Sequence, residues 1–509
     1  MGVFNLIFGW ISQASIFLLL LLFIALLGYC MYIKYTHMKY DHIPGPPRDS
    51  FFSGHSSKLL DIMKDDGVVI LITNNIYCHL NRAETYGPVY KINFMHHVMV
   101  FVSCPETTKE MLMSPKYTKD KFLHNRISSL FGQRFLGNGL VIVRDHEKWY
   151  KQRRIMDPAF SSLYLRSLMG NFNETADKLM DKLSEIADNK TTANMLHLVN
   201  CVTMEVIAKV AFGVDLDLLR KSSPFPRAIE LCLKGMVFNV RDPFFMLNPK
   251  NWSFIREVRG ACRLLRQTGA QWIQQRKTAM RNGEVPKDIL TQIIKSAEEI
   301  MTQEDEEFML DNFLTFFIAG QETTANQLGF CIMELGRHPD ILERVKKEVD
   351  EAIGMKQDIS YDDLGHLGYL SQVLKETLRL YPTAPGTSRD LKEDMVIGGV
   401  HVPGGVVCFS SYGMGRMETF FKDPLKFDPD RFDPDAPKPY YCYFPFSLGP
   451  RSCLGQNFAQ MEAKVVMAKL IQRFDFTLLP GQSFDILDNG ALRPKSGVLC
   501  SLRHRDHRK

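Results

Sequence analysis

The sequence predicts a mainly α fold with minor β structure (α+β), preceded by an N-terminal transmembrane helix. Apolar residues recur at helical spacing over much of residues 160–295, and Gly, Pro and Asn breaks separate the helical stretches. Short runs with strand character occur at 90–102 and 395–402. Residues 1–33 contain no charged side chain, and about 20 consecutive apolar residues are enough to cross a bilayer as a helix.

The N-terminal segment, residues 1–33, is expected to be an uncleaved membrane anchor. It has neither the basic start nor the small-residue cleavage site of a signal peptide. Lys34, Lys39 and Arg48 follow it, and no basic side chain precedes it. The positive-inside rule therefore predicts that the rest of the chain faces the cytosol.

The rest of the chain is predicted to form a spacer and one domain. Residues 34–50 are basic and rich in proline, which makes a stiff hinge. Residues 51–509 contain no internal repeat or second linker, so they are interpreted as a single domain. The net charge of +5 does not suggest a nucleic-acid binder. The eleven cysteines lack paired C-x-x-C spacing, which favours reduced thiols over a disulfide scaffold.

A cysteine loop occupies residues 446–455, Phe-Ser-Leu-Gly-Pro-Arg-Ser-Cys-Leu-Gly. Cys453 precedes an amphipathic helix predicted over 454–473, whose N-terminal N–H groups favour a thiolate, the form that binds metals. Gly455 allows close approach of a flat partner, and Arg451 offers a planar fork suited to a carboxylate. These features indicate a pocket for haem b (iron protoporphyrin IX). A single cysteine, by contrast, is usually just a small buried apolar residue.

The full pattern Phe446-x-x-Gly-x-Arg451-x-Cys453-x-Gly455 resembles the haem-ligating signature of the cytochrome P-450 (haem-thiolate monooxygenase) family. Further motifs follow the family's order across nearly the entire chain. The resemblance implies the cytochrome P-450 fold, with Cys453 as the axial thiolate ligand of the metal. It also implies that Phe446, Arg451 and Gly455 bind the cofactor.

Three more residues are candidate haem contacts. Trp149 and Arg153 lie four apart on one face of a predicted helix, and both can donate a hydrogen bond to a carboxylate. In isolation the pair would more often be a core tryptophan beside a surface arginine. The resemblance implies that they hold a haem propionate, and that Arg389 is a further propionate ligand.

A long helix is predicted over 311–333, and it contains Ala319-Gly-Gln-Glu322-Thr323-Thr. A glycine and a polar pair in so apolar a helix run against helix propensity, and such conflicts cluster at functional sites. The resemblance implies that Thr323 donates a hydrogen bond to iron-bound dioxygen and that Glu322 relays protons. The alternative is that Thr323 bonds back to a helix carbonyl while Glu322 is solvated.

Glu376 and Arg379 are placed one helical turn apart. An exposed pair of this kind contributes little to stability. The resemblance implies instead a buried pair completed by Arg431 from the later segment Phe-Asp-Pro-Asp-Arg-Phe. Its role would be structural, behind the cysteine loop.

Stretches such as 436–439 and 458–467 resemble the branch of the family that hydroxylates cholesterol at carbon 24 of its side chain. Departures from that branch fall where substrate is expected, as at 381–386. The substrate candidates are Ala319, Thr383, Ala384, Pro385 and Ala491. A change of one side chain in an apolar pocket alters the discrimination between two substrates only modestly. A fatty acid, an eicosanoid or a xenobiotic is therefore an alternative substrate. A haem-thiolate sensor without turnover is the alternative from another class.

The resemblance also implies partners and a location. O2 and NADPH–cytochrome P-450 reductase would supply oxygen and electrons at the endoplasmic reticulum membrane, with the catalytic domain facing the cytosol. Basic residues expected on the thiolate side would suit an acidic flavoprotein, although they could equally be ordinary solvated surface charge. They are Lys148, Lys151, Arg153, Arg154 and Lys464.

Overall fold

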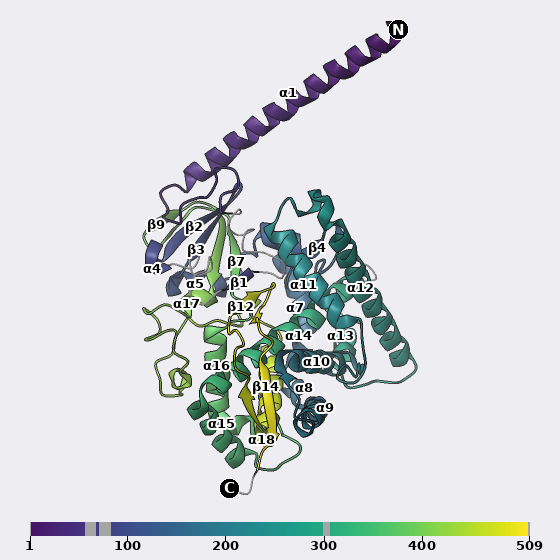
Figure 1. The fold of residues 1–509 in the computed structure, drawn as a ribbon, viewed down its shortest axis with the longest axis vertical. Coiled ribbons are helices and arrows are strands. Elements are labelled where there is room, and N and C mark those ends of the chain that lie inside the picture. The colour runs from purple at the N-terminus through teal and green to yellow at the C-terminus, as the bar shows by residue number, and fades with distance from the viewer. Residues whose placement is uncertain (1, 56–67, 71–82, 299–305, 507–509) are drawn as a thin grey trace.

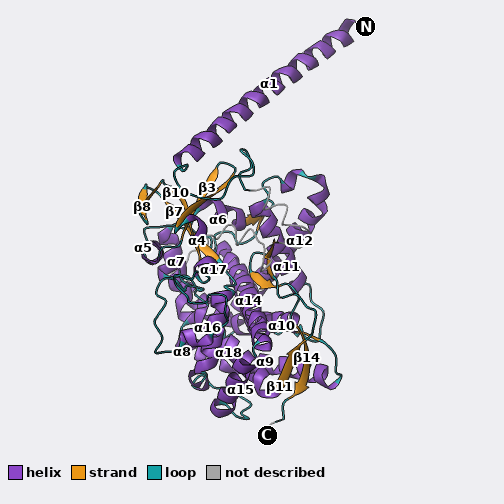
Figure 2. Cartoon of the chain, turned by 60° about the vertical axis from the view of Figure 1, so that its left-hand side comes forward, coloured by secondary structure: helices purple, strands orange, loops and turns teal. Residues whose placement is uncertain are grey.

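The structure, a computed structural model, describes residues 2–55, 68–70, 83–298 and 306–506. Helices dominate and the strands form small sheets, which confirms the predicted mainly α fold with minor β structure (Figure 2). The helices of the described chain are α1 (Gly2–Lys39), α4 (Ala83–Tyr86), α5 (Pro105–Met113), α6 (Lys121–Ser128), α7 (His146–Met156), α8 (Ser162–Arg166), α9 (Met169–Asp188), α10 (Met195–Val206), α11 (Phe225–Arg241), α12 (Trp252–Arg281), α13 (Ile289–Glu298), α14 (Glu306–Arg337), α15 (Pro339–Ala352), α16 (Gly368–Leu380), α17 (Ser411–Met414) and α18 (Gln456–Arg473). The strands are β1 (Val68–Ile70), β2 (Val89–Phe94), β3 (His97–Val102), β4 (Ser129–Leu130), β5 (Gln133–Arg134), β6 (Ala193–Asn194), β7 (Gly386–Leu391), β8 (Met395–Ile397), β9 (Val400–Val402), β10 (Gly405–Ser410), β11 (Phe474–Leu478), β12 (Ile486–Asp488), β13 (Leu492–Pro494) and β14 (Leu499–His504).

Helix α1 projects away from the rest of the molecule (Figure 1). Within its segment Gln13–Lys39, an 18-residue window has a mean hydropathy of 2.7 and is only 6% buried, so the length and composition of this helix suit a membrane span. Near its end, the Tyr29 hydroxyl lies 2.9 Å from Nδ1 of His96, and Nε2 of His37 lies 2.8 Å from the Met95 carbonyl oxygen. These two contacts join α1 to the β2–β3 turn.

A four-stranded sheet of order β2-β3-β10-β7 lies near the base of α1 (Figure 1). The run with strand character at 90–102 forms the antiparallel pair β2–β3. Buried and partly exposed side chains alternate along β3, as expected of a strand with one face on the core. Strand β7 pairs with β10 so that Arg389 stands opposite Val407, and this strand carries Arg389 into the interior.

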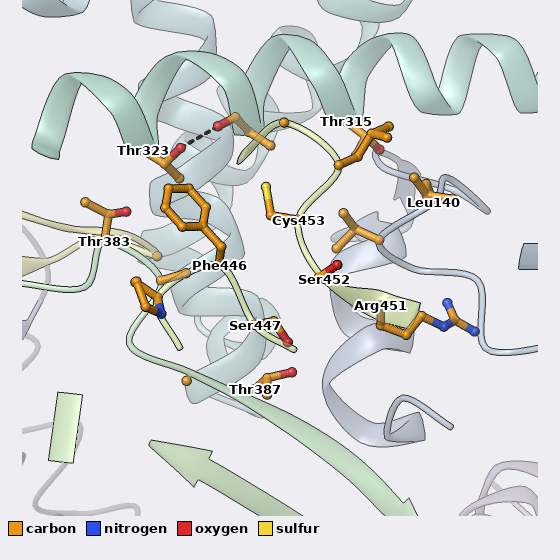
Figure 3. Close-up of a pocket in the computed structure, with 18 of the residues that line it drawn as sticks. Leu140, Thr315, Thr323, Thr383, Thr387, Phe446, Ser447, Arg451, Ser452 and Cys453 are labelled. Carbon is orange, nitrogen blue, oxygen red and sulfur yellow. Dashed lines mark hydrogen bonds between the residues drawn. The ribbon is translucent and has the colours of Figure 1, made fainter. Parts of the chain in front are cut away.

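Helix α14 runs through the main helical core, in contact with α10, α12, α16 and α18. Phe317, Leu328 and Phe330 on this helix are almost completely buried. Burial on several faces explains why the sequence of this helix is apolar nearly all round. Because α18 also packs on α14, the segment before α18, which contains Cys453, is brought beneath the middle of α14 (Figure 3).

Candidate functional site

The cysteine loop is a tight turn held by its own backbone. The Ser447 N–H donates to the Phe444 carbonyl at 2.9 Å, and the Cys453 N–H donates to the Phe446 carbonyl at 2.8 Å. Gly449 has φ +68°, and a Cβ there would lie 2.3 Å from the Leu112 carbonyl oxygen. Only glycine fits that close approach to α5. The turn directs the sulfur of Cys453 toward the space under α14 (Figure 3).

The electrostatic setting of Cys453 differs from the one predicted from sequence. Burial raises the pKa of its thiol, while the Gly455 N–H and the positive charge of Arg153 oppose this shift. The prediction that the helix N-terminus gives a net lowering is therefore wrong for the protein groups alone, because desolvation outweighs the N–H groups. Helix α18 begins at Gln456, beyond the cysteine itself. A metal cation on the sulfur is what would favour the thiolate.

A cavity of about 590 Å³ lies above this loop. Most of the lining atoms are apolar, and the walls come from α6, α11, α14, the segment before β7 and the cysteine loop. The candidate residues that line it are Trp149, Arg153, Ala319, Thr323, Thr383, Ala384, Pro385, Phe446, Arg451, Cys453 and Gly455. Those that do not are Glu322, Arg389, Ala491, Glu376, Arg379 and Arg431.

Basic side chains gather at one side of the cavity. Arg389 is 1% exposed, and its Nη1 donates to Thr387 Oγ1 at 3.1 Å and to the Ser388 carbonyl at 2.9 Å. Its Nη2 has no hydrogen-bond partner among the described residues. Lys119, which sequence motifs did not single out, lines the cavity itself, whereas Arg389 lies outside the lining and acts on Lys119 and Arg451 through its charge.

The pKa values of this basic group are lowered. Burial lowers the pKa of Arg389 and of Arg451 to about 10, and the charge of Arg389 adds to the shift at Arg451. Burial and the charges of Arg389 and Arg451 lower the pKa of Lys119 to about 7. Buried like charges with an unpartnered donor need an anionic ligand to offset their repulsion. The two propionates of haem b fit this requirement, and Cys453 fits its iron.

Trp149 and Arg153, which were expected to donate hydrogen bonds to one haem propionate, contact other protein groups in the structure. Arg153 donates from Nη1 to the Ser452 carbonyl at 2.9 Å and from Nε to Asp157 at 2.6 Å. Its guanidinium thus braces the cysteine loop against α7. Trp149 is buried, and the guanidinium of Arg451 lies over its ring. Both side chains reach the cavity. Arg153 contacts the cysteine loop and Trp149 contacts Arg451, and their role in holding a haem propionate stays a prediction.

Of the neighbouring residues Thr323 and Glu322, only Thr323 lines the cavity. The Thr323 hydroxyl faces the cavity and donates to the Ala319 carbonyl at 2.7 Å (Figure 3). Glu322 does not line the cavity, and Asn326 donates to its carboxyl at 3.2 Å. Burial raises the pKa of Glu322, and the charge of Arg493 opposes this. The back-bond to a helix carbonyl that was considered as an alternative is present, and the Glu322 side chain is partly exposed.

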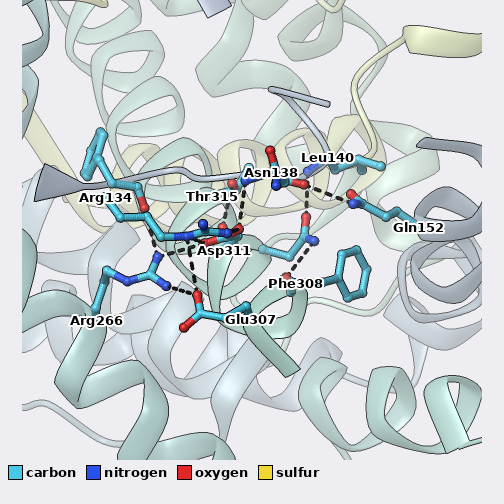
Figure 4. A network of polar contacts seen from close by, with 11 residues as sticks. Arg134, Asn138, Leu140, Gln152, Arg266, Glu307, Phe308, Asp311 and Thr315 are labelled. Carbon is cyan, nitrogen blue, oxygen red and sulfur yellow. Dashed lines mark hydrogen bonds and ion pairs between the residues drawn. The ribbon is translucent and has the colours of Figure 1, made fainter. Parts of the chain in front are cut away.

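A polar network that sequence reasoning missed positions one wall of the cavity (Figure 4). Asp311, fully buried on α14, accepts from Arg134 Nε at 3.0 Å and from the Asn138 N–H at 2.7 Å. The next residue, Asn312, accepts from the Leu140 N–H at 2.8 Å. The two side chains hold the loop before α7 on α14, so Leu140 lines the cavity. A buried Asp-Asn pair in an apolar helix was the signal that could have found them.

Glu376 and Arg379 on α16 come together with Arg431. Glu376 and Arg379 form a bidentate pair with 2.7 Å distances, and both side chains are fully buried. Arg431 Nε lies 3.4 Å from Glu376 Oε1. Arg379 also donates to the Pro424 carbonyl at 2.7 Å, which ties α16 to the segment before the loop.

Comparison with known proteins agrees with this geometry. The cytochrome P450 family model matches residues 69–501. Cytochrome P450 4F2 of Homo sapiens is 29% identical over 91% of this chain and 92% of its own length. Cytochrome P450 3A12 of Canis lupus familiaris is 27% identical over 96% of both chains. Cytochrome P450 4d2 of Drosophila melanogaster is 26% identical over 83% of this chain and 88% of its own length. The chain therefore belongs to the cytochrome P450 family, whose members are monooxygenases that carry haem on a cysteine thiolate.

Proposed function

We propose that this monooxygenase hydroxylates an unactivated carbon of a sterol, namely carbon 24 of the cholesterol side chain. It would do so at the endoplasmic reticulum membrane, with its catalytic domain facing the cytosol. The observation that carries the proposal is the apolar cavity directly over the Cys453 sulfur. This cavity of about 590 Å³ is shared by the haem and the substrate, because its lining includes Cys453 and Arg451 as well as the candidate substrate contacts.

The wall beside α14 suits a flat apolar molecule. Ala319 and Gly320 are the small residues of this helix that face the cavity. Thr383, Ala384 and Pro385 form a second wall of small side chains. Close approach of a rigid, flat hydrocarbon to two such walls excludes water and supports the proposed substrate. Motif resemblance to the cholesterol-hydroxylating branch supports it as well.

Residue roles at the cysteine loop follow from their contacts. In this proposal Cys453 ligates the iron, and Phe446 and Gly455 shape the turn around it. Arg451 and Arg389, with Lys119, bind the two carboxylates. Haem held this way supplies the reductive activation of O2 and the insertion of one oxygen atom into a C–H bond. Thiolate ligation contributes electron density that favours O–O cleavage.

Thr323 and Glu322 are proposed to deliver protons. The Thr323 hydroxyl faces the cavity, and it can rotate away from the Ala319 carbonyl to donate to a ligand. Burial raises the pKa of Glu322 above its ordinary value. General acids act best when their pKa lies near the working pH. Glu322 lies outside the cavity wall, so its proton would travel by way of Thr323.

Electrons are proposed to come from NADPH through NADPH–cytochrome P450 reductase. Lys148 and Arg154 are exposed on α7, next to the cysteine loop that Arg153 braces. Lys464 on α18 donates to the Leu364 carbonyl at 3.0 Å and is less available. Exposed positive charge near the thiolate side would steer an acidic flavoprotein.

Reconstituted turnover tests the proposal. The full-length, haem-loaded protein is mixed with the reductase, NADPH and cholesterol, and the product is analysed by mass spectrometry. A side-chain hydroxyl at carbon 24 is the expected result. Hydroxylation of a fatty acid, an eicosanoid or a xenobiotic, with cholesterol untouched, would replace the proposed substrate. Haem binding without turnover of any of them would favour the sensor alternative.

A further inference from the structure

An ion pair lies in the wall of the otherwise apolar cavity. Arg241, the last residue of α11, pairs through Nη2 with Oδ2 of Asp488, the last residue of β12. Both residues line the cavity. The Asp488 side chain is 2% exposed and that of Arg241 is 15% exposed. Among the described lining residues, Asp488 contributes the one acidic side chain.

The fold brings this pair to the cavity by two routes. One face of α11 lines the cavity with the apolar residues Met236, Val237 and Val240. Arg241 lies at the C-terminal end of the same face. On the other side, the Gly490 N–H donates to Asp488 Oδ1 at 3.0 Å and fixes the carboxylate. A Cβ at Gly490, whose φ is +87°, would lie 2.6 Å from Met236 Cε, so glycine lets the β12–β13 turn close on α11.

We infer that the Arg241–Asp488 pair binds the polar end of the substrate and selects a neutral hydroxyl over a carboxylate. The inference rests on the proposed function and deepens it by naming the class of substrate: an amphipathic lipid with a hydroxyl at the end remote from the oxidised carbon. Its apolar remainder extends along α14 toward Cys453.

The selectivity follows from hydrogen-bond capacity and charge. A hydroxyl both donates and accepts, so it can donate to the Asp488 carboxylate while it accepts from the Arg241 guanidinium. A fatty-acid carboxylate only accepts, and it would bring a second negative charge beside a buried aspartate. Arg241 is already paired with Asp488, so its charge is shared between the two anions. A neutral alcohol leaves that pair intact.

Matched ligands test the inference in the full-length, haem-loaded protein. One pair is a long-chain fatty acid and the alcohol of the same chain length. The other is cholesterol and its analogue without the ring hydroxyl. Dissociation constants come from titrations of the haem absorbance. The wild-type protein is expected to bind the alcohol and cholesterol about tenfold to a hundredfold more tightly than their partners, as for hydrogen bonds to charged groups.

The variant Asp488→Asn removes the negative charge with little change of shape. It is expected to shift the acid-to-alcohol preference toward the acid by about tenfold or more, and to reduce the effect of the ring hydroxyl. Asp485→Asn is the control: Asp485 precedes β12, pairs with Lys495 at 3.7 Å and does not line the cavity. It is expected to keep the wild-type preferences. The double variant Arg241→Gln/Asp488→Asn removes both charges and serves if the single variant does not fold.

The outcomes separate this inference from the proposed function. Unchanged ligand preferences in Asp488→Asn and in the double variant, with cholesterol still hydroxylated, would overturn the head-group site and leave the function standing. Failure of the wild-type protein to bind or hydroxylate cholesterol, with haem in place, would overturn the proposed function itself.

Discussion

The guanidinium of Arg451 stacks on the indole ring of Trp149, with its central carbon 4.3 Å from the ring centroid. The same guanidinium donates to the Val143 carbonyl at 2.8 Å. The Trp149 ring thus holds one face of the Arg451 guanidinium, and the Val143 carbonyl holds one of its edges. Its orientation is set before any carboxylate arrives, which is how a rigid donor gains affinity.

Arg451→Lys is therefore expected to weaken haem retention by about tenfold, because lysine keeps the charge but loses the planar fork and the stacking. Transfer of haem to an acceptor protein measures the effect. Arg416→Lys is the matched control, since Arg416 stacks 3.7 Å from the Tyr412 ring centroid and does not line the cavity. Equal haem loss from both variants would contradict the role of Arg451.

Cys453→Ser removes the sulfur that faces the cavity. Because a hydroxyl is a much weaker metal ligand than a thiolate, loss of the thiolate-type haem absorption spectrum and of turnover is expected. Absorbance of the reduced, carbon-monoxide-treated protein measures it. Cys104→Ser, at a half-buried cysteine outside the cavity, should keep the wild-type spectrum. A normal spectrum in Cys453→Ser would rule out this residue as the axial ligand.

Thr323→Ala is expected to lower product formed per NADPH consumed by about tenfold and to release hydrogen peroxide instead, because proton delivery to bound oxygen is lost. Product, NADPH and peroxide are measured together. Thr278 makes the same back-bond, 3.0 Å to the Gln274 carbonyl, on a helix remote from the cavity wall. Thr278→Ala should stay coupled. Full coupling in Thr323→Ala would refute the assignment.

Glu376→Gln is expected to destabilise the fold by about 3–5 kcal/mol, because it leaves the buried guanidinium of Arg379 without its counter-charge. Urea unfolding of the haem-loaded protein measures the loss. Asp430→Asn breaks the exposed pair with Arg344 and should cost at most about 1 kcal/mol. Similar costs for both variants would show that burial does not set the strength of the first pair.

Glu462 on α18 is completely buried, and burial raises the pKa of its carboxyl well above the ordinary value, although Thr324 opposes the shift. The folded state then holds a proton that the unfolded chain releases above about pH 4. Stability from this group is complete below that pH and falls as pH rises toward the folded pKa.

Glu462→Gln removes that dependence, because glutamine is neutral at every pH and has the same shape. The variant is expected to gain thermal stability over the wild-type protein as pH rises from about 5 to about 9. Melting curves across this range measure the difference. Glu351→Gln, at an exposed position, should show no such trend. A constant difference between Glu462→Gln and the wild-type protein would mean that Glu462 is ionised in the folded state.

Local chemistry explains why so much could be predicted from the sequence. The apolar character of residues 1–33 and the helical periodicity around α14 and α18 are local properties that tertiary packing preserves. The turn around Cys453 likewise depends on neighbouring residues, as in the hydrogen bond from the Cys453 N–H to the Phe446 carbonyl. Fold class and the position of the cysteine loop were therefore within reach of the sequence alone.

Tertiary structure decided what depends on residues distant in the chain. Lys119 joins the basic group only because three segments converge on one cavity. Asp311 organises the loop before α7 across more than 170 residues of sequence. Desolvation raises the pKa of the Cys453 thiol, against the expected direction, and also raises that of Glu322. Burial, and the pairing of charges that are distant in sequence, arise from tertiary packing, and no local sequence pattern encodes them. The Arg241–Asp488 pair in the cavity wall is formed in this way.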